Sequence, residues 1–260
     1  MTAYERVKSA RAKGRPTALA YIEALTTDFM EFHGDRFFGD DAAIVAGIAR
    51  LDGMPITVIG IEKGADTKER LKRNFGAAHP EGYRKALRHM KQAEKFHRPV
   101  LCLIDTSGAF CGIDAEERGQ GQAIAENLMA MMTLETPILS LVIGEGGSGG
   151  ALALAVADEV WMMENAVYSV ISPEGCASIL WKDASRTEEA SKVLKLTAED
   201  LKGLDIIERI FSEKGGIEEA YPLLKLRIKD FFEAKRALAM ETLLEERYQK
   251  FRKIGAVKLR

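Results

Sequence analysis

The chain has 260 residues, enough for one large domain or two small ones. Its composition, 47% hydrophobic and 29% charged, is that of a globular protein and excludes a disordered chain. Lys and Arg number 37 and Asp and Glu 39, so the formal net charge is −2. This balance argues against binding of nucleic acid by the charge of the whole chain.

Cysteine usage and the absence of targeting signals predict a cytoplasmic protein. The three cysteines, Cys102, Cys111 and Cys176, are isolated, which argues against a zinc module and a disulfide scaffold. The first 15 residues carry charges throughout and contain no apolar signal segment. The least charged stretch, 136–157, is interrupted by five glycines, so we interpret it as buried core rather than a membrane span.

The N-terminal part is predicted to be helical and then to form a hairpin. Apolar residues at helical spacing favour an amphipathic helical segment over residues 1–35. A polar turn at 35–41 precedes two strands, 43–51 and 56–61, joined at Asp52-Gly53, a hairpin signal. Residues 64–80 are expected to be a basic loop, after which Pro80 begins a helix. The apolar residues of the first segment are Tyr21, Ile22, Leu25, Phe29 and Phe32.

Short apolar strands alternate with helices in the middle of the chain. Strands are predicted at 100–104, 138–143 and 160–163, with a helix at 115–134 and a glycine-rich loop and short helix at 144–157. Strands that are apolar on both faces imply an α/β fold with a sheet covered on both sides. The charged tail, 218–253, predicts a long helix or a helix pair. We expect a single domain over 1–260, composed of a helical extension (1–35), a core (36–210) and a helical C-terminal segment (211–260).

The glycine-rich run Gly144–Gly150 is the densest chemical signal. A buried strand that leads through glycines into a helix offers unpaired N–H groups and lets a ligand approach the backbone closely. Such a site suits phosphate binding or an oxyanion hole. The alternative is that tight packing of helix against sheet simply requires small residues.

Three named motifs overlap in this run. The pattern G-x-S-x-G around Ser148 indicates a hydrolase nucleophile only if the histidine comes after the serine, but every histidine precedes it. Gly144-x-Gly146-x-x-Gly149 matches the dinucleotide fingerprint, with Glu164 placed to bind a ribose, and this interpretation stays open. A P-loop is excluded because no Lys-Ser/Thr comes after the glycines. The histidines are His33, His79, His89 and His97.

A second loop, Asp105–Ala109, comes after the preceding apolar strand and should reach the same edge of the sheet. Gly108 and Ala109 are therefore candidate backbone donors, the alternative being a turn capped by Asp105. Neither a metal-binding spacing of histidines nor an acid–base pair of side chains is evident. A reaction in which the substrates supply their own base would fit.

A basic run between Lys63 and Arg88 has two interpretations. It can meet a phosphate-bearing ligand or an acidic carrier, or it can be an ordinary solvated face. Its members are Lys63, Lys68, Arg70, Lys72, Arg73, Arg84, Lys85 and Arg88.

Several long segments resemble the alpha subunit of the carboxyltransferase of bacterial acetyl-CoA carboxylase. They read DTSGAFCGIDAEERGQ from Asp105, GEGGSGGALA from Gly144 and YSVISPEGCASILWKDA from Tyr168, supported by HGDRFFGDDAAIV from His33 and KRNFGAAHPEGYRKALR from Lys72. The resemblance extends to the closing RYQKFRKIG and so covers nearly the whole chain. Where many members have DTPGAYPG, this chain has DTSGAFCG, and the loss of two prolines should make that loop less rigid.

The resemblance implies a crotonase-like fold, a superhelix of ββα units, here with helical extensions at both ends. It also implies transfer of a carboxyl group from carboxybiotin to acetyl-CoA, giving malonyl-CoA for fatty acid synthesis. Biotin would be attached to the biotin carboxyl carrier protein and not to this chain. The expected partners are a zinc-bearing beta subunit in an α2β2 assembly, the carrier protein and biotin carboxylase. No metal is expected in this chain.

The resemblance also implies roles for the residues of the two loops. The N–H groups of Gly149 and Gly150 would stabilise the ureido oxyanion of biotin. Gly146, Gly147, Gly108 and Ala109 would contact the substrate. Two other classes of enzyme stay open, a dinucleotide-binding oxidoreductase and a self-sufficient crotonase-like acyl-CoA hydratase or isomerase. The latter would need a carboxylate pair, for which Glu145 and Glu164 are the nearby candidates.

Overall fold

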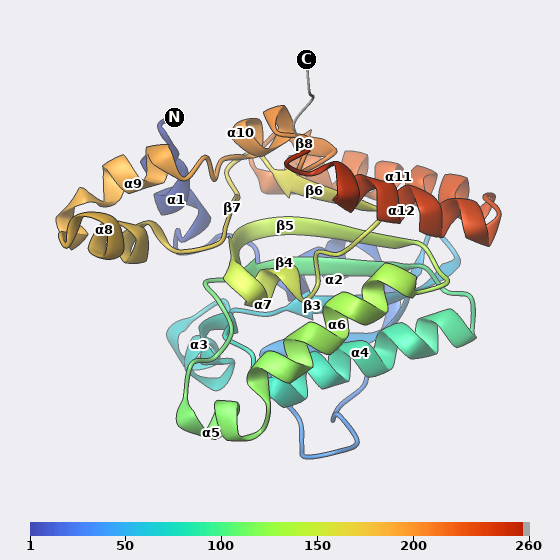
Figure 1. Ribbon diagram of the computed structural model, residues 1–260. Coiled ribbons are helices and arrows are strands. Elements are labelled where there is room, and N and C mark those ends of the chain that lie inside the picture. Colours follow the sequence, from blue (N-terminus) through green and yellow to red (C-terminus); the bar gives the residue numbers. More distant parts are fainter. Residues whose placement is uncertain (257–260) are drawn as a thin grey trace.

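In the computed structural model, which describes residues 1–256, eight strands form one mixed sheet (Figure 1). The strand order is β1-β2-β3-β4-β5-β6-β8, and β7 pairs with β5. β1, β2 and β3 pair antiparallel, and the pairings from β3 onward are parallel. The strands are β1 (Thr27–Glu31), β2 (Ile44–Leu51), β3 (Met54–Ile61), β4 (Val100–Thr106), β5 (Ile138–Gly147), β6 (Glu159–Met163), β7 (Val167–Ser169) and β8 (Arg209–Phe211).

The predicted hairpin between β2 and β3 is confirmed. Leu51 pairs with Met54 across a two-residue turn, and the register continues to Ile44 and Ile61. Asp52 and Gly53 both have positive φ, 47° and 85°. Such a turn matches the twist of the strands, which is why Asp-Gly is favoured there.

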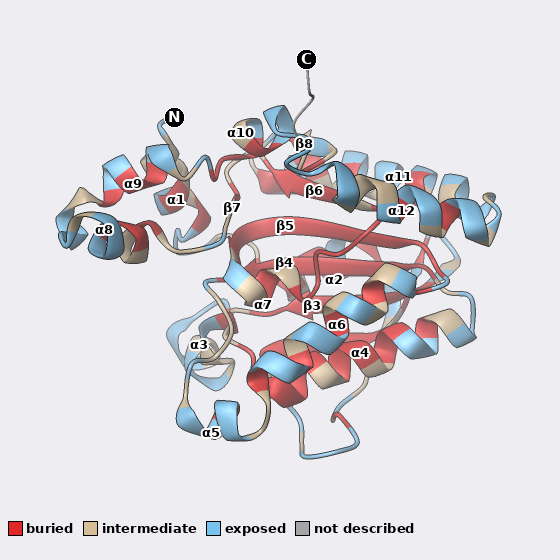
Figure 2. Ribbon diagram, viewed as in Figure 1, coloured by how far each residue is buried: buried red, intermediate tan, exposed pale blue. Residues whose placement is uncertain are grey.

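The core of the fold lies along β4 and β5. All seven residues of β4 are buried, as are nine of the ten residues of β5 (Figure 2). Helices α4 and α6 pack against each other in front of these strands, and α2 lies behind them, in contact with β3 and β4 (Figure 1). The apolar runs of the sequence are therefore covered on both faces, as predicted.

Most predicted helices are present with adjusted bounds. α4 begins at Pro80, where a missing N–H costs no hydrogen bond. The single helix predicted at 115–134 is wrong in one respect, because Gly119, with φ +82°, separates α5 from α6. The helices up to this point are α1 (Ala3–Ala10), α2 (Ala18–Leu25), α3 (Thr67–Lys72), the 3₁₀ helix η1 (Asn74–Gly76), α4 (Pro80–Lys95), α5 (Ile113–Glu117) and α6 (Gln120–Thr133).

Two predictions for the N-terminal third are wrong in part. The helical segment expected over 1–35 ends at Leu25, and residues 27–31 form β1. The edge of β2 supplies backbone partners for these residues, so Phe29 and Phe32 do not continue a helix face. The loop expected at 64–80 contains α3, whose first turn is capped by the Asp66 carboxylate on the N–H of Glu69.

Arginines of the first 15 residues attach the N-terminal segment to distant parts of the chain. The Arg6 guanidinium donates to the carbonyl of Glu164, and Arg11 Nε donates to Glu145 at 2.6 Å. Arg15 donates to the carbonyl of Ile143 at 2.8 Å and to both oxygens of Glu213. The N-terminal extension is therefore held by charge as well as by apolar packing.

The C-terminal segment is a helix pair, as predicted. Its last residues, 257–260, lie outside the described part of the chain. Across residues 1–256 we find no helix with the length and apolar character required to cross a membrane. The division into one domain with two extensions stays a prediction. The remaining helices are α7 (Ser148–Leu152), α8 (Pro173–Trp181), the 3₁₀ helix η2 (Ala184–Arg186), α9 (Thr187–Val193), α10 (Ala198–Gly203), α11 (Ile217–Arg236) and α12 (Met240–Lys253).

Candidate functional site

The carboxyl ends of β4 and β5 meet at one edge of the sheet. The strands run parallel, and Thr106 pairs with Gly146. The glycines expected to form a loop instead continue β5 as far as Gly147, and α7 begins directly at Ser148. The two predicted ligand loops, one after each strand, are thus neighbours in space.

The start of α7 carries free backbone donors. Gly147 precedes the helix and gives it no side-chain cap. The first N–H groups of a helix have no partner within it. Among residues 1–256 no acceptor takes the N–H of Gly149 or Gly150.

Gly150 lies against the loop after β4. A Cβ placed on it would be 2.5 Å from the amide nitrogen of Ala109 and 2.8 Å from the carbonyl carbon of Gly108. Gly147 is equally close to that loop, because its Cβ would be 2.1 Å from the carbonyl oxygen of Ser107. The glycines let the two backbones approach to a distance that no side chain would permit.

The two predicted donors in the β4 loop differ. The N–H of Gly108 donates to Thr106 Oγ1 at 3.0 Å, and Thr106 Oγ1 donates back to the carbonyl of Gly108 at 2.7 Å. Gly108 is therefore not a free donor. Its φ of +154° is a backbone conformation that residues with a side chain rarely adopt, so glycine is favoured at this position. The N–H of Ala109 has no acceptor among the described residues, so it is the available donor of this loop.

Ala109, Gly149 and Gly150 border one cavity of about 300 Å³. Its titratable side chains are Cys111 and Glu116, both exposed. The cavity thus combines the uncommitted amides of Ala109, Gly149 and Gly150 with a lining that contains no histidine. Its lining is Gly108, Ala109, Phe110, Cys111, Glu116, Gln120, Gly121, Ile124, Ser148, Gly149 and Gly150.

Gly146 has a different surrounding from Gly149 and Gly150. A Cβ on Gly146 would be 2.7 Å from the ring of Tyr168, and Gly146 does not border the 300 Å³ cavity. It lines a much smaller hollow of about 20 Å³, together with Gly147 and Glu145. The structure therefore brings Gly149, Gly150, Gly108 and Ala109 together at the larger cavity. Gly146 and Gly147, which were also expected to contact the substrate, do not line that cavity.

A buried charge cluster joins the ends of β4 and β5. Lys63 Nζ lies 2.8 Å from Asp105 Oδ1 and 2.9 Å from Glu145 Oε2. Asp105 Oδ1 also accepts the N–H of Glu145 at 2.9 Å. Burial alone would raise the pKa of Glu145, but the charges of Lys63 and Arg11 outweigh it and hold that pKa below its usual value.

The cluster sits where the register of β5 shifts. Ile104 pairs with Val142 but Thr106 pairs with Gly146, so β5 has two more residues than β4 in this interval. Such irregularities bend a strand and redirect the chain beyond the bend. Glu145, which the cluster holds, lies within this interval, and the shift therefore affects where α7 begins.

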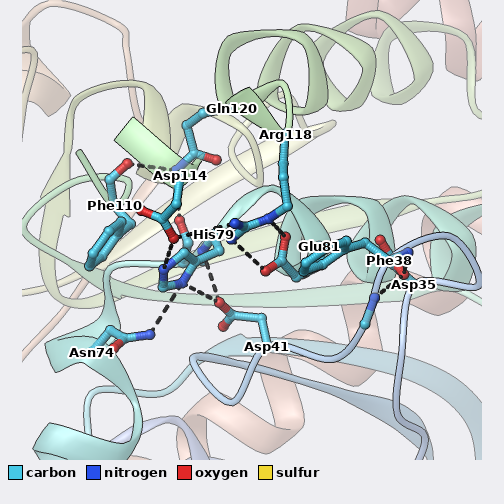
Figure 3. A network of polar contacts seen from close by, with 12 residues as sticks. Asp35, Phe38, Asp41, Asn74, His79, Glu81, Phe110, Asp114, Arg118 and Gln120 are labelled. Atoms are coloured by element: carbon cyan, nitrogen blue, oxygen red, sulfur yellow. Dashed lines mark hydrogen bonds and ion pairs between the residues drawn. The ribbon is translucent and has the colours of Figure 1, made fainter. Parts of the chain in front are cut away.

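The loop that carries Ala109 is fastened by a second polar network (Figure 3). His79 stacks on Phe110 with ring centroids 4.0 Å apart, and Asp41 Oδ2 accepts the N–H of His79 at 2.8 Å. Further along, Arg118 contacts Glu81 at 3.0 Å. The loop is thus held in spite of its lacking the two prolines.

The side chains required by the hydratase and hydrolase alternatives are not available. Glu145 is ion-paired to Lys63 and Arg11, and Glu164 accepts from Ser212 and from the N–H of Glu213. The two carboxylates are therefore held by separate partners and do not form a pair. Ser148 is exposed and makes no side-chain hydrogen bond to a histidine within residues 1–256.

The dinucleotide alternative also loses support. Two glycines of its fingerprint, Gly144 and Gly146, lie in β5, and the third, Gly149, lies in α7, so no phosphate-binding turn separates strand from helix. That helix has only five residues. Glu164, the expected ribose ligand, is already occupied by backbone and hydroxyl donors.

The basic run proves mainly structural. Lys85 is fully buried against Asp40 and the carbonyl of Asp41, and Arg84 pairs with Asp35 at 2.8 Å. These contacts secure the loop between β1 and β2. Lys63, which belongs to the charge cluster, is the member of the run beside the candidate site, and its position in the sequence gave no sign of that.

Within residues 1–256 no group of three or more His, Cys, Asp or Glu side chains could hold a metal ion. A second cavity, of about 450 Å³, shares Ser148 and Gly149 with the first. Its other lining residues are mostly apolar, among them Leu152, Tyr168 and Phe251. It offers packing surface but few polar groups.

Comparison with known proteins identifies the family of the chain. The model of the family "acetyl co-enzyme A carboxylase carboxyltransferase-like" matches residues 1–255. Over 258 residues the chain is 60% identical to the acetyl-coenzyme A carboxylase carboxyl transferase subunit alpha of Ruminiclostridium cellulolyticum, covering 99% of both chains. Over 260 residues it is 58% identical to the corresponding subunit of Clostridium acetobutylicum, covering 98% of this chain and 95% of the relative.

Solved structures with low sequence identity share the fold. Transcarboxylase 12S aligns with a TM-score of 0.72 at 17% identity, over 89% of this chain. The chain spans less than half, 45%, of that protein's length. A chain of a Pseudomonas malonate decarboxylase hetero-tetramer aligns with a TM-score of 0.70 at 16% identity, over 89% of this chain and 92% of that one. The likeness confirms the predicted crotonase-like fold.

Proposed function

Because the chain belongs to the family of acetyl-coenzyme A carboxylase carboxyltransferase alpha subunits, we propose that it transfers a carboxyl group from carboxybiotin to acetyl-CoA. The product is malonyl-CoA, which supplies fatty acid synthesis. The observation that carries the proposal is the approach of Ala109 to Gly150, with Gly149 lining the same cavity, in a chain 60% identical to a named alpha subunit.

The backbone amides stabilise negative charge. When biotin gives up the carboxyl group, charge develops on its ureido oxygen. Gly149 and Gly150 donate to that oxygen from the start of α7, and Ala109 donates from the opposite loop. Donors fixed in advance lower the barrier without reorganising, by about 3–4 kcal/mol for each donor.

No side chain of this cavity is needed as a base. Cys111 and Glu116 are exposed, and Glu145 is held as an ion-paired carboxylate. When the N–C bond of carboxybiotin breaks, CO2 is released and the biotin anion takes the α-proton of acetyl-CoA. The resulting enolate attacks the CO2 and forms the C–C bond of malonyl-CoA. This chain then contributes binding, orientation and charge stabilisation.

The partners are those of the family. A zinc-bearing beta subunit completes the active site in an α2β2 assembly, and it holds the acetyl-CoA enolate. The biotin carboxyl carrier protein delivers carboxybiotin that biotin carboxylase has formed. The charge of the chain, −2, and the absence of a membrane-spanning helix in residues 1–256 fit a cytoplasmic assembly without nucleic acid.

The test is decarboxylation of malonyl-CoA with biotin methyl ester as the carboxyl acceptor. The chain is assayed alone and with a beta subunit from the same genome. Activity confined to the mixture supports the proposal. Turnover of an enoyl-CoA or acyl-CoA by this chain alone would show a self-sufficient hydratase or isomerase and would overturn it.

A further inference from the structure

Gln120, the first residue of α6, is buried beside the candidate cavity with only half of its amide satisfied. The residue is 3% exposed. Its Nε2 donates to the carbonyl of Ala78 at 2.9 Å and to the carbonyl of Phe110 at 2.8 Å. Its Oε1 is buried and has no hydrogen-bond partner among residues 1–256.

The orientation of this amide is fixed by its partners. Turning the amide over would place Oε1 against two carbonyl oxygens, which repel it. In Figure 3 the nitrogen of Gln120 faces Phe110 and the oxygen points away from it. Oε1 is therefore a committed acceptor without a donor, and native proteins rarely leave such an atom unpaired.

The cavity gives this acceptor a chemical context. Gln120 lines it together with Ala109, Gly149 and Gly150, so a residue with a buried, unpaired acceptor stands beside backbone amides that have no acceptor among residues 1–256. A cyclic urea has the complementary pattern, an oxygen flanked by two ring nitrogens. When one nitrogen carries the carboxyl group, the other keeps its N–H.

We propose that Gln120 Oε1 accepts a hydrogen bond from the ureido N–H of carboxybiotin on the nitrogen that does not carry the carboxyl group. This inference rests on the proposed function and adds a recognition residue to it. Gln120 orients the ring, and the amides hold its oxygen. A site that hydrogen-bonds an N–H discriminates against an analogue that lacks it, because the acceptor is then left unpaired.

The experiment compares two acceptors in the malonyl-CoA decarboxylation assay with the beta subunit present. One is biotin methyl ester. The other is its cyclic carbamate analogue, in which a ring oxygen replaces the non-reacting N–H. The enzyme variants are wild type, Gln120→Met, which keeps the length but not the acceptor, and Gln122→Met as a matched control, since Gln122 is exposed and bonds Glu126 on the same helix.

We expect wild type to favour the urea over the carbamate by roughly 10–100-fold in kcat/KM. Any difference in the intrinsic reactivity of the two acceptors is common to all variants and cancels in the comparison. Gln120→Met also removes the two hydrogen bonds of Nε2 to the carbonyls of Ala78 and Phe110, so activity should fall with both acceptors. It should fall further with the urea than with the carbamate, so that the added preference disappears. Gln122→Met should keep the full preference.

An equal loss on both acceptors in Gln120→Met would overturn the inference, because the residue would then act only as a clamp on the Phe110 loop. Circular dichroism melting shows whether each variant is folded. An inactive wild type with biotin methyl ester in the presence of the beta subunit would overturn the proposed function itself, which separates the two failures.

Discussion

Arg247 and Asp158 form an ion pair that is closed off from solvent, with Arg247 Nε 2.8 Å from Asp158 Oδ1 and side-chain exposures of 0% and 2%. The remaining guanidinium N–H groups donate to the carbonyls of Met131, Leu134 and Thr136. Asp158 Oδ2 also accepts the N–H of Ile138 at 2.7 Å, where β5 begins. Arg247 of α12 thus satisfies carbonyls at the end of α6 and, through Asp158, is linked to the start of β5.

Replacing Arg247 by Met should lower the free energy of unfolding by about 3–5 kcal/mol, because it leaves a buried carboxylate and three carbonyls without their donor. Urea denaturation measures the change. The control is Lys235→Met, which removes the half-exposed pair with Glu246 and should cost less than about 1 kcal/mol. An equal decrease in the free energy of unfolding for the two substitutions would contradict the stabilising role given to the buried Arg247 ion pair.

Substitution by alanine should lower kcat at one of two neighbouring glycines at the start of α7 and leave it nearly unchanged at the other. At Gly150 a Cβ would press on the backbone of Ala109, so Gly150→Ala must move the two donor loops apart. At Gly149 the nearest atom is on the Ile124 side chain at 3.8 Å, an ordinary contact. We expect Gly150→Ala to lower kcat by roughly 10²–10³-fold and Gly149→Ala to change it little.

The measurement for this pair is steady-state decarboxylation with the beta subunit present, accompanied by melting curves of both variants. Gly149→Ala keeps its N–H, so its near-normal activity does not conflict with a donor role. Near-normal activity of Gly150→Ala would instead show that the close approach of the two loops is irrelevant to catalysis.

The Lys63 cluster should give the protein a specific dependence of stability on pH. The lowered pKa of Glu145 means that its contribution is present above the unfolded value of 4.5 and is lost as the pH falls through the lower folded value. For Lys63, burial is outweighed by Asp105 and Glu145, so its pKa is raised. Its contribution is present below the unfolded value of 10.5 and is lost as the pH rises through the higher folded value.

Lys63→Met should therefore cost most near neutral pH, roughly 3 kcal/mol by the scale of broken buried pairs. The gap to wild type should narrow as the pH falls from 4.5 through the lower folded pKa of Glu145, because that carboxylate is then protonated and no longer pairs with Lys63. Urea titrations between pH 3 and 9 measure it, with the exposed Lys72→Met as control. A gap that stays constant across this range would show that the lost contribution is packing and not charge.

The sequence predicted correctly those parts of the fold that depend on a few adjacent residues. The turn at Asp52-Gly53 could be expected from its residues, because few other pairs of residues readily adopt two positive φ values in succession. Pro80 predicted the start of a helix because its fixed φ and missing N–H suit the first helical position. The apolar runs of β4 and β5 predicted burial on both faces, which depends on composition and not on neighbours.

Features that depend on distant partners could not be predicted. β1 exists because β2 offers it an edge, and its own residues also fit an amphipathic helix. The register shift at Glu145 depends on Asp105 and Lys63, which lie 40 and 82 residues away.

The candidate site shows the same division. The glycine run and the position of each loop after a strand indicated this edge of the sheet and made Ala109 a candidate donor. The resemblance to the carboxyltransferase alpha subunit, and not the glycine pattern, assigned the donor role to Gly149 and Gly150. The commitment of the Gly108 N–H depends on how the Thr106 hydroxyl is oriented, which no spacing reveals. Gln120 escaped notice because its partners, Ala78 and Phe110, are 42 and 10 residues away.

The arginines at the N-terminus impose an order on how the protein is assembled during its synthesis. The partners of Arg15 lie 128 to 198 residues further along the chain. At ribosomal speeds of about 5–20 residues per second, Arg15 therefore waits on the order of 10–40 s for the last of them. Arg11 cannot reach Glu145 until β5 has been made and has joined the sheet. The residues that leave the ribosome first are thus among the last to settle beside the candidate site.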